Sequence, residues 1–456
     1  MVEMTLTAAE PANIGPARNN STLASKRLLA LWLAILVCWP LGAEQLFPPL
    51  ILLIYIIICR SSISKTFPAE IPFNGKLILA FLFLAVFSAF RIQENIRVIT
   101  FTRDFMIWAT ALFFLCHFYA CSETGNLRDY AKYFSLAFWF FVLTSILYVA
   151  FPSFEFPSIA YLVSPSSITD TMMGKRFLMK SLGEQLYFLG FTDRVSSIFG
   201  SPIHLACLVV LLLPFAMAFR RSAWSKGLTF LAALFIVFFA QARLAMIMLL
   251  IMPIVQSIYM ATFKTKRAPF DILLLAAASL TFLVFAAAYF DEITSSLSDL
   301  FFERRRGSAE ARGQIYSLTW NWFLERPFIG YGTQIDVPEL DYPLGSHSTP
   351  LGLMFKHGII AATLMITVLI STLMSHISLL RGSITRQESR FHALLCAAYT
   401  CYLMLLMLNE FIVDVYHTVI LFVYIALVTK AATLKKRKHI VLERNRRMQD
   451  TVVPAR

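Results

Sequence analysis

Arg304–Gly358 reads RRRGSAEARGQIYSLTWNWFLERPFIGYGTQIDVPELDYPLGSHSTPLGLMFKHG, and long apolar runs flank this stretch on both sides. From Arg304 to His347 it contains five arginines and no lysine. The histidine stands where the chain returns to an apolar helix. Arginines gathered beside one histidine at the edge of a membrane are typical of a site that binds an anion.

The composition excludes a soluble protein. The chain has 456 residues, of which 58% are hydrophobic and 15% charged, and its mean hydropathy is +0.68. These values predict an all-α polytopic membrane protein. The net charge of +13 does not indicate nucleic-acid binding, because the basic residues cluster between apolar runs, where they determine topology. The seven cysteines form no CxxC pair, which argues against a disulfide or metal framework.

The apolar runs predict about 12 transmembrane helices. Several are shorter than the ~20 residues that an upright span needs, and the first two could form one broken hairpin. No cleaved signal peptide is expected, so the first helix acts as a signal anchor. The predicted helices are 27–40, 45–59, 76–90, 104–121, 131–151, 202–219, 227–241, 243–261, 270–290, 350–380, 392–408 and 411–430.

The positive charges predict the orientation of these helices. If the N-terminus is inside, most basic loops and the basic C-terminal tail fall on the cytoplasmic side, as the positive-inside rule requires; Arg91, Arg97 and Arg103 fall outside and count against this frame. We therefore expect both termini to be cytoplasmic. The predicted divisions are a tail at 1–26, a transmembrane domain at 27–430 and a basic tail at 431–456.

Two long outer loops remain, at about 152–201 and 291–349. The first contains TMMGKRFLMKSLGEQLYFLGF (171–191), whose apolar and basic residues alternate at helical spacing and predict an interfacial helix. The second is net acidic, with five arginines against nine acidic residues. Its arginines are therefore exceptions to the positive-inside rule. No internal repeat of the transporter kind is evident.

His347 is the strongest candidate for catalysis. It follows a turn-like Pro-Leu-Gly-Ser segment and precedes Pro350, a suitable first-turn residue of a helix. A helix N-terminus and nearby arginines both disfavour imidazolium, and a neutral imidazole can take a proton from a hydroxyl. The simpler alternative is a loop histidine that caps a helix.

Three arginines are candidates for anion binding. Arg312 lies on a predicted helix at 309–325 and can present two donors to phosphate oxygens. Arg194 precedes a small-residue turn and the sixth helix, while Arg243 lies between two apolar runs and must face protein or water. Each could instead be a solvated or snorkelling side chain. The run Arg304–Arg306 favours a surface or lipid-headgroup contact.

Other polar residues give no defined motif. His204 reads as a packing residue, His357 as a helix-interior residue, and Glu410 and Asp414 as boundary acids without an assigned role. Gly330-Tyr331-Gly332 indicates a turn. No HExxH, acidic pair or P-loop occurs in the sequence, so no metal and no cofactor is predicted.

Three pieces of the sequence resemble the O-antigen ligase and polymerase superfamily of bacterial glycan transferases. His347-Ser348, then nine residues, then Gly358-Ile359-Ile360-Ala361 is similar to its ligase signature, from which Ala361 departs. Arg312 with Trp320, Pro327, Gly330 and Gly332 resembles its loop helix and Pro-x-x-Gly-x-Gly ending. RVSSIFGSPIHLA (194–206) resembles a further segment, with Gly200 displaced and His204 where an Asn is expected. The resemblance covers about residues 190–375.

The resemblance implies a metal-independent, GT-C-like transferase of the bacterial inner membrane, with a large helical periplasmic loop before the tenth helix. Its donor would be a glycan on undecaprenyl diphosphate. Arg194, Arg312 and, by its depth in the membrane, Arg243 would hold the diphosphate, and His347 would deprotonate or orient the acceptor hydroxyl. The acceptor would be another glycan, in a surface or exopolysaccharide polymerase, or lipid A core, in an O-antigen ligase.

Two alternatives from other classes stay open. A lipid-linked oligosaccharide flippase would use the arginines to attract and bind the lipid-linked oligosaccharide, and it would perform no chemistry. A membrane O-acyltransferase also uses a histidine, but it needs a donor from the cytoplasm, whereas His347 is predicted outside.

Overall fold

The computed structural model describes most of the chain as helix. Two small antiparallel sheets are the other regular elements of its described part. The described residues are 21–42, 47–59, 71–92, 95–122, 126–151, 155–166, 179–181, 183–184, 194–199, 201–220, 222–264, 306–337, 340, 343–409 and 414–452.

The predicted apolar segments coincide with helices wherever they fall within the described residues; the segment 270–290 lies outside them. By length and composition, six of the described helices suffice to cross a membrane, namely most of α4 and α17 and all of α5, α11, α15 and α16. The bounds are α1 (Ser21–Leu41), α2 (Pro49–Ile58), α3 (Phe73–Ala89), α4 (Asn95–Cys121), α5 (Arg128–Ala150), α9 (Pro202–Ala218), α10 (Ala223–Phe239), α11 (Arg243–Lys264), α14 (Arg306–Glu325), α15 (Thr349–Arg381), α16 (Arg386–Leu408) and α17 (Val415–Val452).

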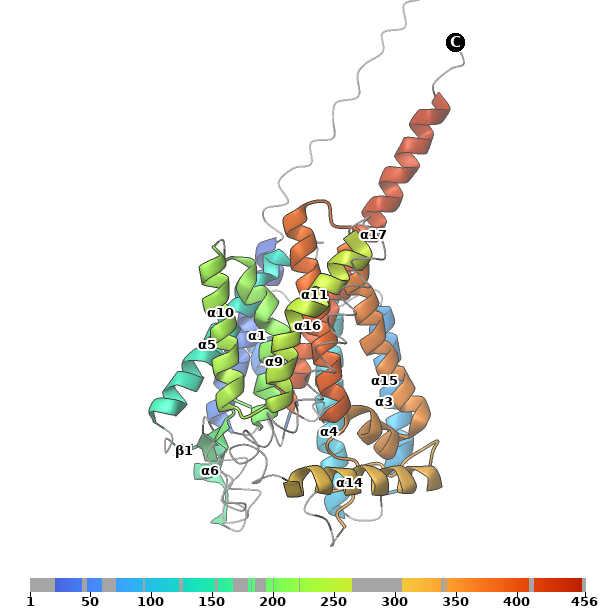
Figure 1. Ribbon diagram of the computed structural model, residues 1–456. Coiled ribbons are helices and arrows are strands. Elements are labelled where there is room, and N and C mark those ends of the chain that lie inside the picture. The colour runs from blue at the N-terminus through green and yellow to red at the C-terminus, as the bar shows by residue number, and fades with distance from the viewer. Residues whose placement is uncertain are drawn as a thin grey trace, which may run out of the picture.

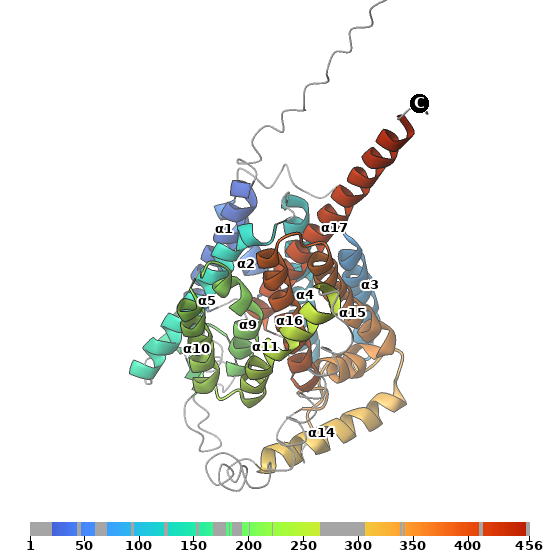
Figure 2. The same ribbon diagram turned by 45° about the horizontal axis from the view of Figure 1, so that its top comes forward.

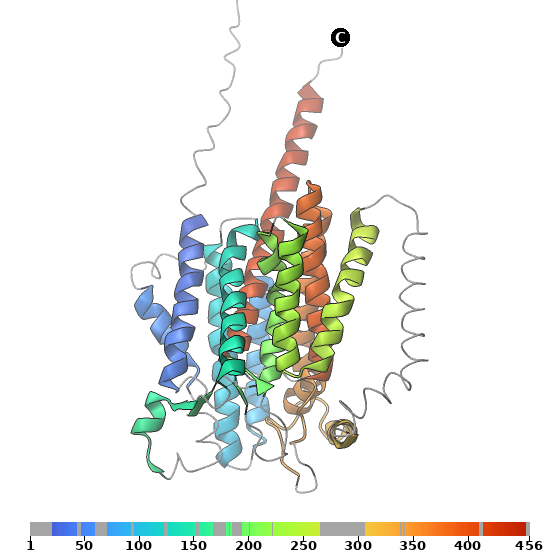
Figure 3. The ribbon, with the colours of Figure 1, turned by 60° about the vertical axis from the view of Figure 1, so that its left-hand side comes forward.

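The helices form one bundle with α9 and the first half of α17 at its centre. Both are buried on nearly every side, as expected for helices that are apolar all round. The start of α1 and the end of α17 lie at one end of the bundle, and α14 lies across the opposite end (Figures 1 and 3). The last part of α17 projects beyond the other helices (Figure 2).

Short polar residues define the starts of several helices. Ser348 precedes α15 and accepts a hydrogen bond from the Leu351 N–H at 3.4 Å, and Ser201 does the same for Ile203 at the start of α9. Both helices have proline in the first turn, where its missing N–H costs nothing. These caps fix where the chain enters the bundle at the end that carries α14.

The segment 152–201, predicted as the first outer loop, differs in structure from its prediction. Its described part contains a short helix, α6 (Ile159–Val163), and four short strands. The interfacial helix predicted at 171–191 is wrong at residues 179–181 and 183–184, which form β2 and β3; the rest of that segment lies outside the described residues. Strand pairing satisfies backbone groups that a helix would otherwise bond internally. β1 (Glu155–Pro157) pairs with β2 (Met179–Ser181), and β3 (Gly183–Glu184) pairs with β4 (Arg194–Val195).

Candidate functional site

His347 occupies a tight turn at the start of α15. Its backbone has φ 63°, in the left-handed region, and Gly345 two residues earlier has φ 79°. A non-glycine residue in this region costs of order 1 kcal/mol or more and persists only where its surroundings enforce it. The turn is therefore held by contacts from neighbouring elements.

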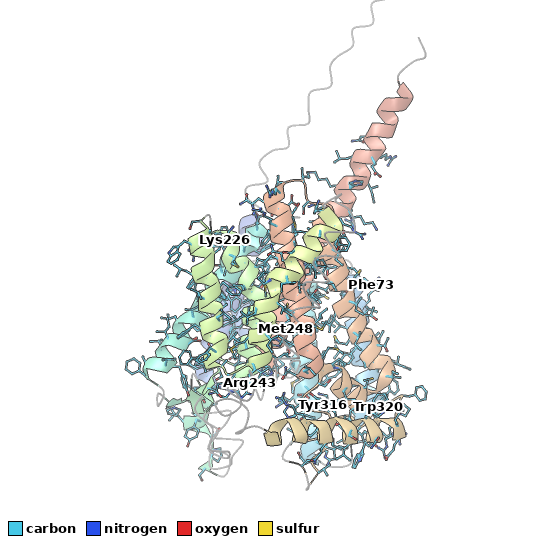
Figure 4. All side chains as sticks on the ribbon, viewed as in Figure 1. Phe73, Lys226, Arg243, Met248, Tyr316 and Trp320 are labelled. Carbon is cyan, nitrogen blue, oxygen red and sulfur yellow. The ribbon has the colours of Figure 1, made fainter. Side chains whose placement is uncertain are left out.

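α14 supplies two of these contacts. The Tyr316 hydroxyl donates to the His347 carbonyl at 2.8 Å, and the Gly345 N–H donates to the Thr319 hydroxyl at 3.1 Å. Tyr316 and Thr319 are three residues apart, so they share one face of the helix. Figure 4 shows Tyr316 on α14 where that helix crosses the end of the bundle.

The end of α16 supplies a third contact. Thr349 follows the histidine by two residues, and both its N–H (3.1 Å) and its hydroxyl (2.7 Å) donate to the Asn409 carbonyl. Two helices far apart in sequence thus fix the chain on either side of His347.

Arg312 lies one helical turn before Tyr316 on α14, near enough for its charge to act on both Tyr316 and His347. Burial, together with the smaller effect of the positive charge of Arg312, lowers the pKa of His347 to about 4. The imidazole is therefore neutral near pH 7. Burial also raises the pKa of Tyr316, with Arg312 acting against it, so the hydroxyl stays protonated. A neutral base beside a permanent cation suits the deprotonation of a hydroxyl next to a bound anion.

The chain after α14 docks onto a break in α15. Gly358 has φ 81° and ψ 169°, a conformation essentially restricted to glycine. Backbone hydrogen bonds join the two segments, from Tyr331 N–H to Phe355 (2.9 Å), from Gly332 N–H to Lys356 (2.7 Å) and from Ile359 N–H to Pro327 (2.7 Å). The proline–glycine motif and the glycine of the histidine motif are thus direct partners in space.

The other two predicted arginines lie at a different turn, the one between α10 and α11. Arg194 is buried, and its guanidinium donates from Nε (3.1 Å) and Nη2 (2.9 Å) to the carbonyl of Ala240. Ala240 ends α10 and stands three residues before Arg243, the half-buried first residue of α11. Figure 4 shows Arg243 near the same end of the bundle as Tyr316, with Lys226 at the other end. Arg194 therefore serves at least to fix the α10–α11 turn.

His204 and Asp414 belong to a buried polar cluster. Asp414 accepts from the His417 N–H at 2.9 Å and so caps α17, while its other oxygen lies 3.7 Å from His204 Nδ1. The His204 and His417 rings stack at 5.6 Å, and Tyr402 reaches His417 at 3.2 Å.

The remaining candidates have simpler positions. His357 is buried inside α15 with its Nδ1 3.1 Å from the Ser88 hydroxyl, as predicted for a helix-interior residue. Arg306 begins α14, whereas Arg304, Arg305 and Glu410 lie outside the described residues. Among the residues that the structure describes, His, Cys, Asp and Glu form no group of three suited to a metal ion.

Residues 228–366 match the sequence model of the Wzy_C family, which is described as O-antigen ligase. This segment belongs to the O-antigen ligase superfamily. It contains Arg243, Arg312 and His347, so the family predicted from the histidine motif is confirmed. No curated protein matches the chain. Together with the six helices long enough to cross a membrane, the family indicates a multi-pass bacterial membrane protein that transfers glycans. Proteins of this family act on lipid-linked donors and acceptors.

Tyr316 and Thr319 were missed by the sequence analysis. The signal that could have found them is their spacing from Arg312, because positions four and seven residues later lie on the same helix face. That spacing does not show that the face meets the histidine turn, which depends on how α14 packs against α15.

Proposed function

We propose that this protein transfers a glycan from undecaprenyl diphosphate to an acceptor hydroxyl at the periplasmic face of the inner membrane. One observation carries the proposal: His347 is half-buried and neutral, and the charge of Arg312 on α14 acts on it. The acceptor distinguishes a surface or exopolysaccharide polymerase from an O-antigen ligase. Of the two, we favour the polymerase slightly.

The reaction forms one glycosidic bond and breaks one glycosyl–phosphate bond. The acceptor oxygen attacks the anomeric carbon of the donor, and the bond from that carbon to the diphosphate breaks with its electron pair on the diphosphate. Arg312, Arg194 and Arg243 stabilise this negative charge. His347 orients the acceptor hydroxyl and takes its proton. Since the diphosphate is already a good leaving group, positioning, charge and a base are sufficient.

The proposal includes the remaining predictions on architecture. In this proposal, the protein has twelve transmembrane helices in a GT-C-like arrangement. Both termini lie in the cytoplasm, and α14 lies in the periplasm. The transfer is metal-independent, because guanidinium groups bind the diphosphate. A reporter fused near residue 345 tests the orientation, and a cytoplasmic signal there would overturn both the topology and the mechanism.

The activity is tested with purified protein and a lipid-diphosphate-linked oligosaccharide, with and without lipid A core. A ladder of longer glycans without added acceptor identifies a polymerase, and product that requires lipid A core identifies a ligase. His347→Ala should abolish either product. His439→Ala is a matched control, since this histidine is exposed on the far part of α17. No product with any acceptor would favour transport.

A further inference from the structure

The carbonyl of His347 is held by one side chain from a distant part of the sequence. The Tyr316 hydroxyl lies 2.8 Å from it and 3.4 Å from the Leu408 carbonyl at the end of α16. Tyr316 is half-buried, so water competes less for these carbonyls than it would at an exposed position. One hydroxyl thus lies between the histidine turn and α16.

The left-handed backbone of His347 makes this contact important for the direction of the imidazole. A residue at φ 63° relaxes toward a more common conformation when it is released. That relaxation would rotate the Cα–Cβ bond and carry the ring away from its present position. A displacement of about 1 Å at a reacting group can cost on the order of 100-fold in rate.

We propose that Tyr316 is a positioning residue for glycan transfer, whose hydroxyl holds the His347 backbone so that the imidazole faces the acceptor hydroxyl. This inference rests on the proposed function of His347. It also gives α14 a double role, because the same helix face presents Arg312 toward the bound anion and Tyr316 toward the base. The anion site and the base are then fixed relative to each other by one rigid helix.

Thr319 assists from the next turn of α14. Its hydroxyl accepts from the Gly345 N–H at 3.1 Å, and it is completely buried. Thr319 thus anchors the start of the turn, and Tyr316 anchors its end. Loss of either anchor should loosen the same turn.

Tyr316→Phe tests the proposal because it removes only the hydroxyl. We expect kcat to fall about 10- to 100-fold while KM for the lipid-linked donor changes by less than about 2-fold. Tyr259→Phe is the matched control. It removes a half-buried hydroxyl that contacts Thr400 at 2.8 Å between α11 and α16, and it should leave kcat unchanged.

The pH profile separates positioning from a general loss of folded protein. His347 is flanked by Arg312 and Tyr316 of α14, and its pKa of about 4 results first from burial. A loosened turn admits water and raises this pKa toward its usual 6.5. The acidic limb of kcat/KM should therefore move to higher pH in Tyr316→Phe. Partial unfolding would lower the amplitude and leave the limb in place.

The outcomes distinguish this inference from the proposed function. If His347→Ala remains active, the proposed function fails. If His347→Ala is inactive but Tyr316→Phe keeps the wild-type kcat and acidic limb, only the positioning role is refuted. An equal loss in Tyr259→Phe would also refute it. If Tyr316→Phe does not fold, Thr319→Val takes its place with the same expected shift and the same contradicting result.

Discussion

Gly358→Ala should separate the chain after α14 from α15. A Cβ at this position would overlap the backbone carbonyl of Phe328, and the glycine backbone conformation (φ 81°, ψ 169°) costs an alanine about 1–3 kcal/mol. If the segment moves away, three backbone hydrogen bonds are lost, each with a net value of about 1 kcal/mol. The expected loss in the free energy of unfolding is roughly 4–6 kcal/mol.

The substitution should also reach the active site. Phe355 precedes the break, stacks on Tyr331 at 4.8 Å and packs in a small core with Leu344, just before the histidine turn. Thermal unfolding of the purified protein in detergent measures the stability, and the glycan ladder measures the activity. Both should fall together.

Gly227→Ala and Gly313→Ala are matched controls. Both glycines are helical and would meet no atom within 4 Å of an added Cβ. Alanine there should be neutral or should stabilise the helix by up to about 1 kcal/mol. If Gly358→Ala melts at the same temperature as these controls, the docking of the proline–glycine segment at the break does not stabilise the fold as argued.

Two further predictions concern stability. Asp414→Ala should lower the melting temperature more than Asp414→Asn, because asparagine keeps the helix cap, which is worth about 0.5–2 kcal/mol; equal melting of the two variants would argue against the cap. The pKa of His347 is about 4 in the folded protein and about 6.5 when unfolded, so the unfolded chain binds an extra proton between these values and stability falls as pH falls from 6.5 to 4. His347→Gln lacks this contribution, and its melting temperature should fall less than that of the wild type between pH 7 and pH 5.

Much of the fold was predictable because membrane helices need long apolar runs. The predicted helix at 309–325 also agrees with α14, since the segment contains good helix formers and Pro327 marks its end. The interfacial helix at 171–191 was wrong at β2 and β3, because pairing with distant strands overrides the local pattern. α17 continues to Val452, far beyond the apolar run that ends near 430, because lysine and arginine are good helix formers.

The sequence proposed candidate residues for the site but could not give their geometry. The sequence proposed His347 and Arg312 by type and position, and in the structure Arg312 is near enough for its charge to act on His347. It did not show the left-handed backbone of the histidine or the hydroxyl of Tyr316, because both depend on the packing of α14 over α15. Arg194 was expected to bind an anion, and in the structure its guanidinium also holds the Ala240 carbonyl, a tertiary contact that no local pattern reveals.

The central claim is that His347 acts in a chemical step that releases the lipid diphosphate. The most direct test measures undecaprenyl diphosphate released from the lipid-linked oligosaccharide by the purified wild type and by His347→Ala. We predict release by the wild type in step with glycan elongation or transfer, and a reduction of about 10²–10⁴-fold in the variant. Equal release by both proteins, or movement of the intact donor across the membrane without release, would contradict the account.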